Sequence, residues 1–227
     1  NFNSAFEQQK VRTWSYHEER ALLYGLSASA VDGANIVEIG SFCGGSAAFL
    51  AAGRRQRGNG RIHCIDPMLG APPWLGIPSE LGTLNEFRTN LLALGIMGYI
   101  DLHVGDSPSV SAVWPALPID AVLIDGDHSF LGALQDIECW APKIKPGGYI
   151  LFDDIDNIPE MQRLQSIMNR LTSLRDEGNV GGIGIFQVVI PGFAFMQELS
   201  RHLEEEGIFR PWNYLPLHDR KDAPAYL

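Results

Sequence analysis

Two acidic stretches of the sequence have residue types and spacing suited to binding a cation. Asp125 follows the apolar run AVLI (121–124), and Asp153 and Asp154 follow the run YILF (149–152). Both runs are typical of buried strands, and adjacent strands of a parallel sheet lie about 4.8 Å apart. Carboxylates that converge at such strand ends raise each other's pKa unless a cation lies between them. Because oxygen ligands favour Mg²⁺, Mn²⁺ or Ca²⁺ over zinc, we expect one of these hard cations there.

The segment VEIGSFCGGS (37–46) predicts a strand, a glycine turn and the start of a helix. Its glycines at 40 and 44 do not have the G-x-G-x-x-G spacing of a dinucleotide site, because the second glycine of that pattern would fall at Phe42. The segment also lacks the lysine of a phosphate-binding P-loop. The loop therefore suits a ligand with a small charged portion better than a diphosphate.

Acidic residues also end the next two predicted strands. Asp66 ends the run RIHCID (61–66), where a carboxylate can accept both hydroxyls of a ribose. Asp106 and Ser107, in the stretch GDS, follow the strand after it and are suited to the edge of an adenine. A glycine loop, a ribose acid and an adenine acid together describe a nucleoside without phosphates, which points to S-adenosylmethionine.

The elements that would position these residues alternate along the chain. We expect strands at 35–40, 61–66, 99–106, 119–127, 146–154 and 182–190, and helices at about 15–31, 45–58, 83–96, 129–144, 159–177 and 194–206. This order predicts an α/β fold, Rossmann-like and doubly wound, with a mostly parallel sheet of about seven strands and helices on both faces. Ligands of such sheets bind at the carboxyl ends of the strands. The proline- and glycine-rich stretch 67–82 predicts a long surface loop. We expect a solvated helix face at Arg54, Arg55 and Arg57.

Five blocks, VEIGSFCGGS, CIDP, GDS, LIDGDHSF and GGYILFDDI, resemble the class I S-adenosylmethionine-dependent methyltransferases. The resemblance covers about residues 15–190. It is closest to the metal-dependent O-methyltransferases of small molecules, of the catechol and caffeoyl-CoA type and of the macrolide- and aminocoumarin-sugar type. It implies a set of contacts to the cofactor and the metal: Glu38, Gly40, Ser41, Gly44 and Ser46 at the methionine part, Asp66 at the ribose, Asp106 and Ser107 at the adenine, Asp125 beside the cofactor, and Asp125, Asp153 and Asp154 at Mg²⁺. Glu38 has a second interpretation, in which it caps backbone N–H groups of the loop and does not touch the ligand.

Two residues are candidates for the general base. The catechol members of the family carry a lysine three residues after the first metal aspartate, and His128 stands at that position here. A histidine with a pKa near neutrality can accept the proton of a hydroxyl group. Asp127 is the alternative, and we favour His128. His17 would lie over the active site if the first predicted helix covers it.

The expected activity is a Mg²⁺-dependent methyl transfer from S-adenosylmethionine to a hydroxyl of a small molecule. A vicinal diol suits bidentate binding to a cation, and the stretch DGDHS favours a sugar or natural-product substrate. A short-chain dehydrogenase is disfavoured because the chain contains no Tyr-x-x-x-Lys pair. A non-catalytic S-adenosylmethionine-binding domain and a cephalosporin-hydroxylase-like enzyme of the same fold remain the alternatives.

Composition limits the partners. The 227 residues carry a formal net charge of −10, which argues against nucleic acid, since such binding normally uses a basic face. Three scattered cysteines indicate buried thiols and a cytoplasmic location, and we expect no membrane segment. We expect one methyltransferase domain over 1–227, with an N-terminal helical lid (1–33), a cofactor-binding core (34–190) and a C-terminal extension (191–227). The apolar stretch IPGFAFM (190–196) is suited to packing against a second copy, which would make a homo-oligomer.

Overall fold

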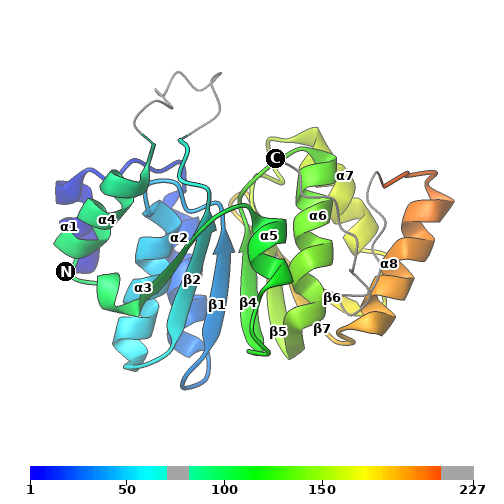
Figure 1. Ribbon diagram of the computed structural model, residues 1–227, viewed down its shortest axis with the longest axis horizontal. Helices are drawn as coiled ribbons and strands as arrows, with labels where there is room; N and C mark the ends of the chain where they lie inside the picture. The colour runs from blue at the N-terminus through cyan, green and yellow to red at the C-terminus, as the bar shows by residue number, and fades with distance from the viewer. Residues whose placement is uncertain (71–81, 211–227) are drawn as a thin grey trace.

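The computed structural model describes residues 1–70 and 82–210. Within these residues, one sheet of seven strands runs through the molecule. The strand order is β3-β2-β1-β4-β5-β7-β6 (Figure 1). Five strands are parallel: β1 (Asn35–Ile39), β2 (Arg61–Asp66), β3 (Ile100–Val104), β4 (Ile119–Ile124) and β5 (Ile144–Phe152). The last two, β6 (Leu174–Val180) and β7 (Ile183–Val188), form an antiparallel hairpin, with β7 beside β5. The predicted fold class is confirmed.

Helices cover both faces of the sheet. The first face carries α1 (Phe2–Gln9), α2 (His17–Ser29), α3 (Gly45–Arg57) and α4 (Leu84–Ala93). The second carries α5 (Ser107–Ala112), α6 (Phe130–Trp140), α7 (Pro159–Met168) and α8 (Phe193–Glu205). Short 3₁₀ helices, η3 (Met97–Tyr99) and η4 (Ala141–Lys143), lead into β3 and β5. In Figure 1, α1 to α4 gather at one end of the molecule and α6 to α8 at the other.

Alternating side chains of each central strand enter two separate apolar cores. In β1, Ile36 packs with the first group of helices, whereas Val37 and Ile39 pack with the second. All three are at most 3% exposed. Burial on both faces explains why these strands appear in the sequence as largely apolar runs.

The prediction of one helix over 159–177 was wrong in its second half. The helix α7 ends at Met168, and the chain then enters β6 at Leu174. Leu171 and Leu174 are buried as the helical spacing required, but they are buried around a turn and a strand start. The strand LRDEGNV is charged and exposed on the outer edge of the sheet, so pairing with β7 determines its structure more than local propensity does.

The expectation of a solvated face for all three arginines of α3 was wrong for Arg54. Its side chain is fully buried between α2 and α3. The guanidinium donates to the hydroxyl of Ser27 (3.2 Å) and to the carbonyls of Val31 (3.0 Å) and Ala30 (3.3 Å). A buried charge is tolerated here because its N–H groups find acceptors at the end of α2.

The three cysteines are buried, as the sequence indicated. Over residues 1–70 and 82–210, none of the helices has the length and apolar character needed to cross a membrane. The predicted loop 67–82 lies mostly outside the described residues.

Candidate active site

The glycine loop between β1 and α3 is held tightly against the end of β4. Gly40 has a φ of 85°, and a Cβ at this position would lie 2.0 Å from the carbonyl oxygen of Asp125. Phe42, with a φ of 44°, and Gly44, with a φ of 84°, also adopt left-handed conformations. A non-glycine residue in that region is strained and is common at functional sites. Only glycine fits at position 40, because the loop crosses the β4 end at contact distance.

Glu38 is fully buried beneath this loop and binds two of its hydroxyl groups. Its carboxylate accepts hydrogen bonds from Ser41 Oγ (2.5 Å) and Ser46 Oγ (2.6 Å). Burial raises the pKa of the Glu38 carboxyl, and the two serine hydroxyls oppose that rise. Three residues predicted at the methionine part of the cofactor therefore lie together. Glu38 binds side-chain hydroxyls here, whereas the alternative interpretation had it capping backbone N–H groups.

Asp66 ties the glycine loop to the end of β2. Its Oδ2 accepts from the backbone N–H groups of Ser41 (2.9 Å) and Phe42 (2.8 Å), and its Oδ1 accepts from Met68 N (2.6 Å). Each carboxylate oxygen has two lone-pair directions, so Oδ1 keeps one free for a further donor. The predicted ribose acid thus also orders the loop that would receive the methionine part.

Asp106 and Ser107 begin the short helix α5. Asp106 caps it, since its Oδ1 accepts from Ser109 N (2.9 Å). The Ser107 hydroxyl accepts from Trp140 Nε1 (2.8 Å) and is buried against α6. The predicted adenine residues therefore lie at the same edge of the sheet as the glycine loop, with the Ser107 side chain already bound to Trp140.

The acids after β4 and β5 converge, as strand adjacency required. Ile124 and Phe152, the last residues of the two strands, pair with each other, and Asp153 N donates to Ile124 O (3.1 Å). The side chains of Asp125 and Asp153 are hydrogen-bonded to each other. Burial and then the neighbouring carboxylates raise the pKa of Asp153 to about 9, and burial likewise raises the pKa of Asp125. Asp154 adopts a left-handed φ of 59° beside them.

This donor set fits a hard divalent cation, although it is not a completed site. Over residues 1–70 and 82–210, no group of three or more His, Cys, Asp and Glu side chains stands ready to hold a metal ion. Two carboxyl groups can hydrogen-bond to each other only when one carries a proton. A cation between Asp125 and Asp153 would take the place of that proton and offset the burial and the carboxylate repulsion that raise their pKa.

The two candidate bases point in different directions. His128 Nε2 lies 3.5 Å from Asp125 Oδ1 and 3.7 Å from Asp154 Oδ2, and it is buried without a hydrogen-bond partner among the described residues. Asp127 turns instead toward the start of α6, where its Oδ1 accepts from Ser129 N (2.9 Å) and its carboxyl group packs on Gly132. His128 therefore faces the acids, and Asp127 orders the turn before the helix.

Comparison with known proteins identifies the family. A model described as a methyltransferase domain matches residues 37–155, more than half of the chain. The chain belongs to the methyltransferase domain family. The match begins at the glycine loop and ends just after the Asp153–Asp154 pair, so it includes most of the residues described above.

The methyltransferase domain also resembles individual proteins. It is 25% identical over 147 residues to an uncharacterized protein, R132, of Acanthamoeba polyphaga mimivirus, a match that spans 63% of this chain and 61% of the viral protein. The O-methyltransferase TomG of Streptomyces achromogenes, solved with S-adenosylmethionine, superposes with a TM-score of 0.60 at 16% identity, covering 83% of this chain and 89% of TomG. An O-methyltransferase of Bacillus cereus, solved with S-adenosylhomocysteine, gives a TM-score of 0.57 at 15% identity, covering 83% and 90%. At these identities the structures show a shared fold, and with the family match they confirm the predicted resemblance to class I methyltransferases.

An N-terminal segment, Arg12–Tyr16, crosses the glycine loop of the methyltransferase domain. Arg12 forms a two-point ion pair with Glu86 on α4, and Thr13 lies against Gly45, where a Cβ would be 2.5 Å away. The Trp14 ring packs on Phe42 with 4.9 Å between ring centroids. These contacts could not be predicted from sequence patterns, because each joins residues far apart in the chain.

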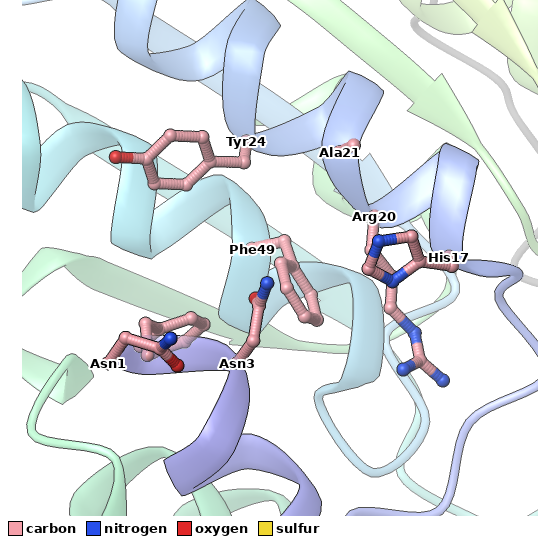
Figure 2. Close-up of a pocket in the computed structure, with 8 residues that line it drawn as sticks. Asn1, Asn3, His17, Arg20, Ala21, Tyr24 and Phe49 are labelled. Atoms are coloured by element: carbon pink, nitrogen blue, oxygen red, sulfur yellow. The ribbon is translucent and has the colours of Figure 1, made fainter.

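A cavity of about 330 Å³ lies elsewhere in the domain, between α1, α2 and α3. His17, Arg20, Tyr24 and Phe49 are among its lining residues, as Figure 2 shows. None of the predicted cofactor or metal residues lines it. His17, considered above as a residue over the active site, lines this cavity.

Proposed function

We propose that this domain transfers the methyl group of S-adenosylmethionine to a hydroxyl oxygen of a small molecule, with Mg²⁺ held by Asp125, Asp153 and Asp154. One observation carries the proposal. The acids and His128 meet at the end of β4, and Gly40 of the predicted cofactor loop packs on the Asp125 carbonyl at that same point. The predicted cofactor and cation sites are therefore adjacent. That TomG was solved with S-adenosylmethionine supports the choice of cofactor.

The chain's own residues would divide the work as follows. The glycine loop and Asp66 would hold the cofactor, and the three aspartates would hold the cation. When bound, S-adenosylmethionine supplies the electrophilic methyl group, and Mg²⁺ lowers the pKa of a hydroxyl and fixes its direction. His128 Nε2, which has no other partner among the described residues and lies within 4 Å of two of the acids, would accept the hydroxyl proton.

We further propose a vicinal diol, on a sugar or another natural product, as the acceptor. Two adjacent hydroxyl groups can occupy two positions of an octahedral cation while the aspartates occupy others. The strongly acidic surroundings favour a neutral acceptor over an anionic one, because an anion would face several carboxylates at short range.

The test is transfer of labelled methyl from S-adenosylmethionine to a panel of sugar and aromatic diols, with Mg²⁺ or with a chelator. We expect turnover only with Mg²⁺. Asp153→Asn should lower kcat by about 100-fold or more, because a metal ligand is lost, while S-adenosylhomocysteine binds within about twofold of the wild-type affinity. The control is Asp32→Asn, which removes an exposed acid that precedes β1 and pairs with Arg57. Undiminished turnover in the chelator would contradict the metal role, and cofactor binding without turnover on any diol would favour a binding domain.

A further inference from the structure

Glu19 is a buried carboxylate that bridges two separate parts of the chain. It lies in the first turn of α2 and is 3% exposed. Its Oε2 accepts from the backbone N–H of Tyr16 (2.7 Å), which caps the helix, and its Oε1 accepts from the backbone N–H of Gly182 (2.7 Å). Gly182 lies in the turn between β6 and β7, so this second contact spans 163 positions of sequence.

The β6–β7 turn is shaped to receive this carboxylate. Gly181 has a φ of 59°, and a Cβ there would lie 2.6 Å from Glu19 Oε1. A Cβ on Gly182 would lie 2.7 Å from Asp156 Oδ1. A side chain at either position would displace the Glu19 or Asp156 carboxyl group, because the turn packs directly between Glu19 and the segment that follows β5.

The same turn fixes the backbone that carries the acids. Gly182 O accepts from Ile155 N (3.0 Å), and Ile155 directly follows Asp153 and Asp154. Asp154 is in a left-handed conformation, which persists only where its surroundings enforce it. The chain of contacts therefore runs from Glu19 through Gly182 to Ile155, next to the strained residue.

We propose that Glu19 is a positioning residue that holds the Asp153–Asp154 backbone in its binding geometry through the β6–β7 turn. This inference rests on the metal role proposed above. Some residues do not bind the metal but orient the side chains that do. Replacing such a residue typically changes metal affinity by 10- to 100-fold. Glu19 would act in this way through the backbone of its neighbours.

The test compares Glu19→Gln with Glu18→Gln. Glutamine keeps the size of the side chain but offers one acceptor oxygen in place of two, so one of the two amides loses its partner. Glu18 is the adjacent residue and lies on the exposed side of the same turn. Glu18→Gln therefore removes the same charge without removing these contacts. We expect Glu19→Gln to weaken Mn²⁺ binding, followed by electron paramagnetic resonance, at least about 10-fold. S-Adenosylhomocysteine affinity should stay within about twofold, and Glu18→Gln should change neither.

Hydrogen exchange at the Ile155 and Gly182 amides separates this inference from the proposed function. Faster exchange at both amides in Glu19→Gln, with weaker Mn²⁺ binding, supports the positioning role. Unchanged exchange or unchanged Mn²⁺ affinity overturns it. If the wild-type protein binds no Mn²⁺, the proposed metal site fails, and the positioning of Asp153–Asp154 for a metal fails with it, whatever the exchange rates. Glu198→Gln, on the remote helix α8, should leave the Mn²⁺ affinity unchanged, so general destabilisation does not imitate the effect.

Discussion

Single residues at the carboxyl edge of the sheet combine tight packing with strained backbone. Phe42, Met68 and Asp154 have positive φ angles without being glycine, and each follows the end of a different parallel strand. Such conformations cost of order 1–3 kcal/mol each and last only where neighbouring contacts fix them. They lie at the edge of the sheet where the predicted cofactor and cation residues gather.

Replacing Gly40 by alanine tests the close approach of the glycine loop to β4. The added Cβ would meet the Asp125 carbonyl at 2.0 Å, so the loop must move away from the acids. We expect a loss of stability of about 3 kcal/mol or more and at least a tenfold loss of S-adenosylhomocysteine affinity, by denaturant unfolding and calorimetry.

Gly33 provides the control, since it has a similar φ of 71° with nothing within 4 Å of its Cβ position. Gly33→Ala should cost only about 1–2 kcal/mol of backbone strain and leave binding intact. Equal affinity in the two variants would show that the loop is not held at this point.

Sequence patterns predicted which acidic side chains would lie near one another, because these side chains follow strand ends. Asp125 and Asp153 could be placed together from strand adjacency alone. The roles of Glu19 and Arg54 could not, because each depends on contacts between elements that a single sequence does not align. Glu19 carries a local signal, an acid three residues after a helix cap, but that signal explains only the start of α2.

At the scale of elements, α8 is joined to the loop before β6 by one carboxylate. Glu198 Oε1 accepts from Thr172 N (2.7 Å) and Thr172 Oγ1 (2.8 Å), and Oε2 accepts from Ser173 N (2.9 Å). Burial alone would raise the pKa of Glu198, but these hydrogen bonds outweigh it and lower the pKa to about 2. The helix α8 is therefore held to this loop by hydrogen bonds that the ionised Glu198 carboxylate accepts.

The pKa of Glu198 gives a pH-dependent prediction. The unfolded chain has a Glu pKa near 4.5, so the stabilisation is complete above that pH and is lost as the pH falls toward 2. Glu198→Gln should therefore lower the melting temperature at pH 7 by roughly 2–4 °C. The difference between the two proteins should shrink steadily between pH 4.5 and pH 2. A difference that stays constant over this range would assign the effect to packing.

The elements differ in how well local sequence determines them. The central parallel strands could be predicted because burial on both faces makes them mostly apolar. The edge strand β6 could not, since its residues are charged and its pairing with β7 is a tertiary effect. A helical spacing of leucines continued past the true end of α7 and concealed the change of structure.

For the whole molecule, the sheet brings together residues from distant parts of the chain. The order β3-β2-β1-β4-β5 places the point where the strand order reverses between the parallel strands β1 and β4, where ligands of such sheets bind. Glu38 lies near the end of β1, the glycine loop follows that strand, and Asp125 follows β4. The fold thus places the predicted cofactor loop after β1 and the predicted cation site after β4, at the ends of two neighbouring strands.

The most direct test of the account is a crystal structure with S-adenosylhomocysteine and Mn²⁺, using anomalous scattering to locate the metal. We expect one Mn²⁺ peak within about 2.3 Å of carboxylate oxygens from Asp125, Asp153 and Asp154. We also expect the homocysteine part beside the loop from Gly40 to Ser46 and the ribose at Asp66. A cofactor bound elsewhere, or a structure in which these acids hold no Mn²⁺ while the cofactor is in place, would contradict it.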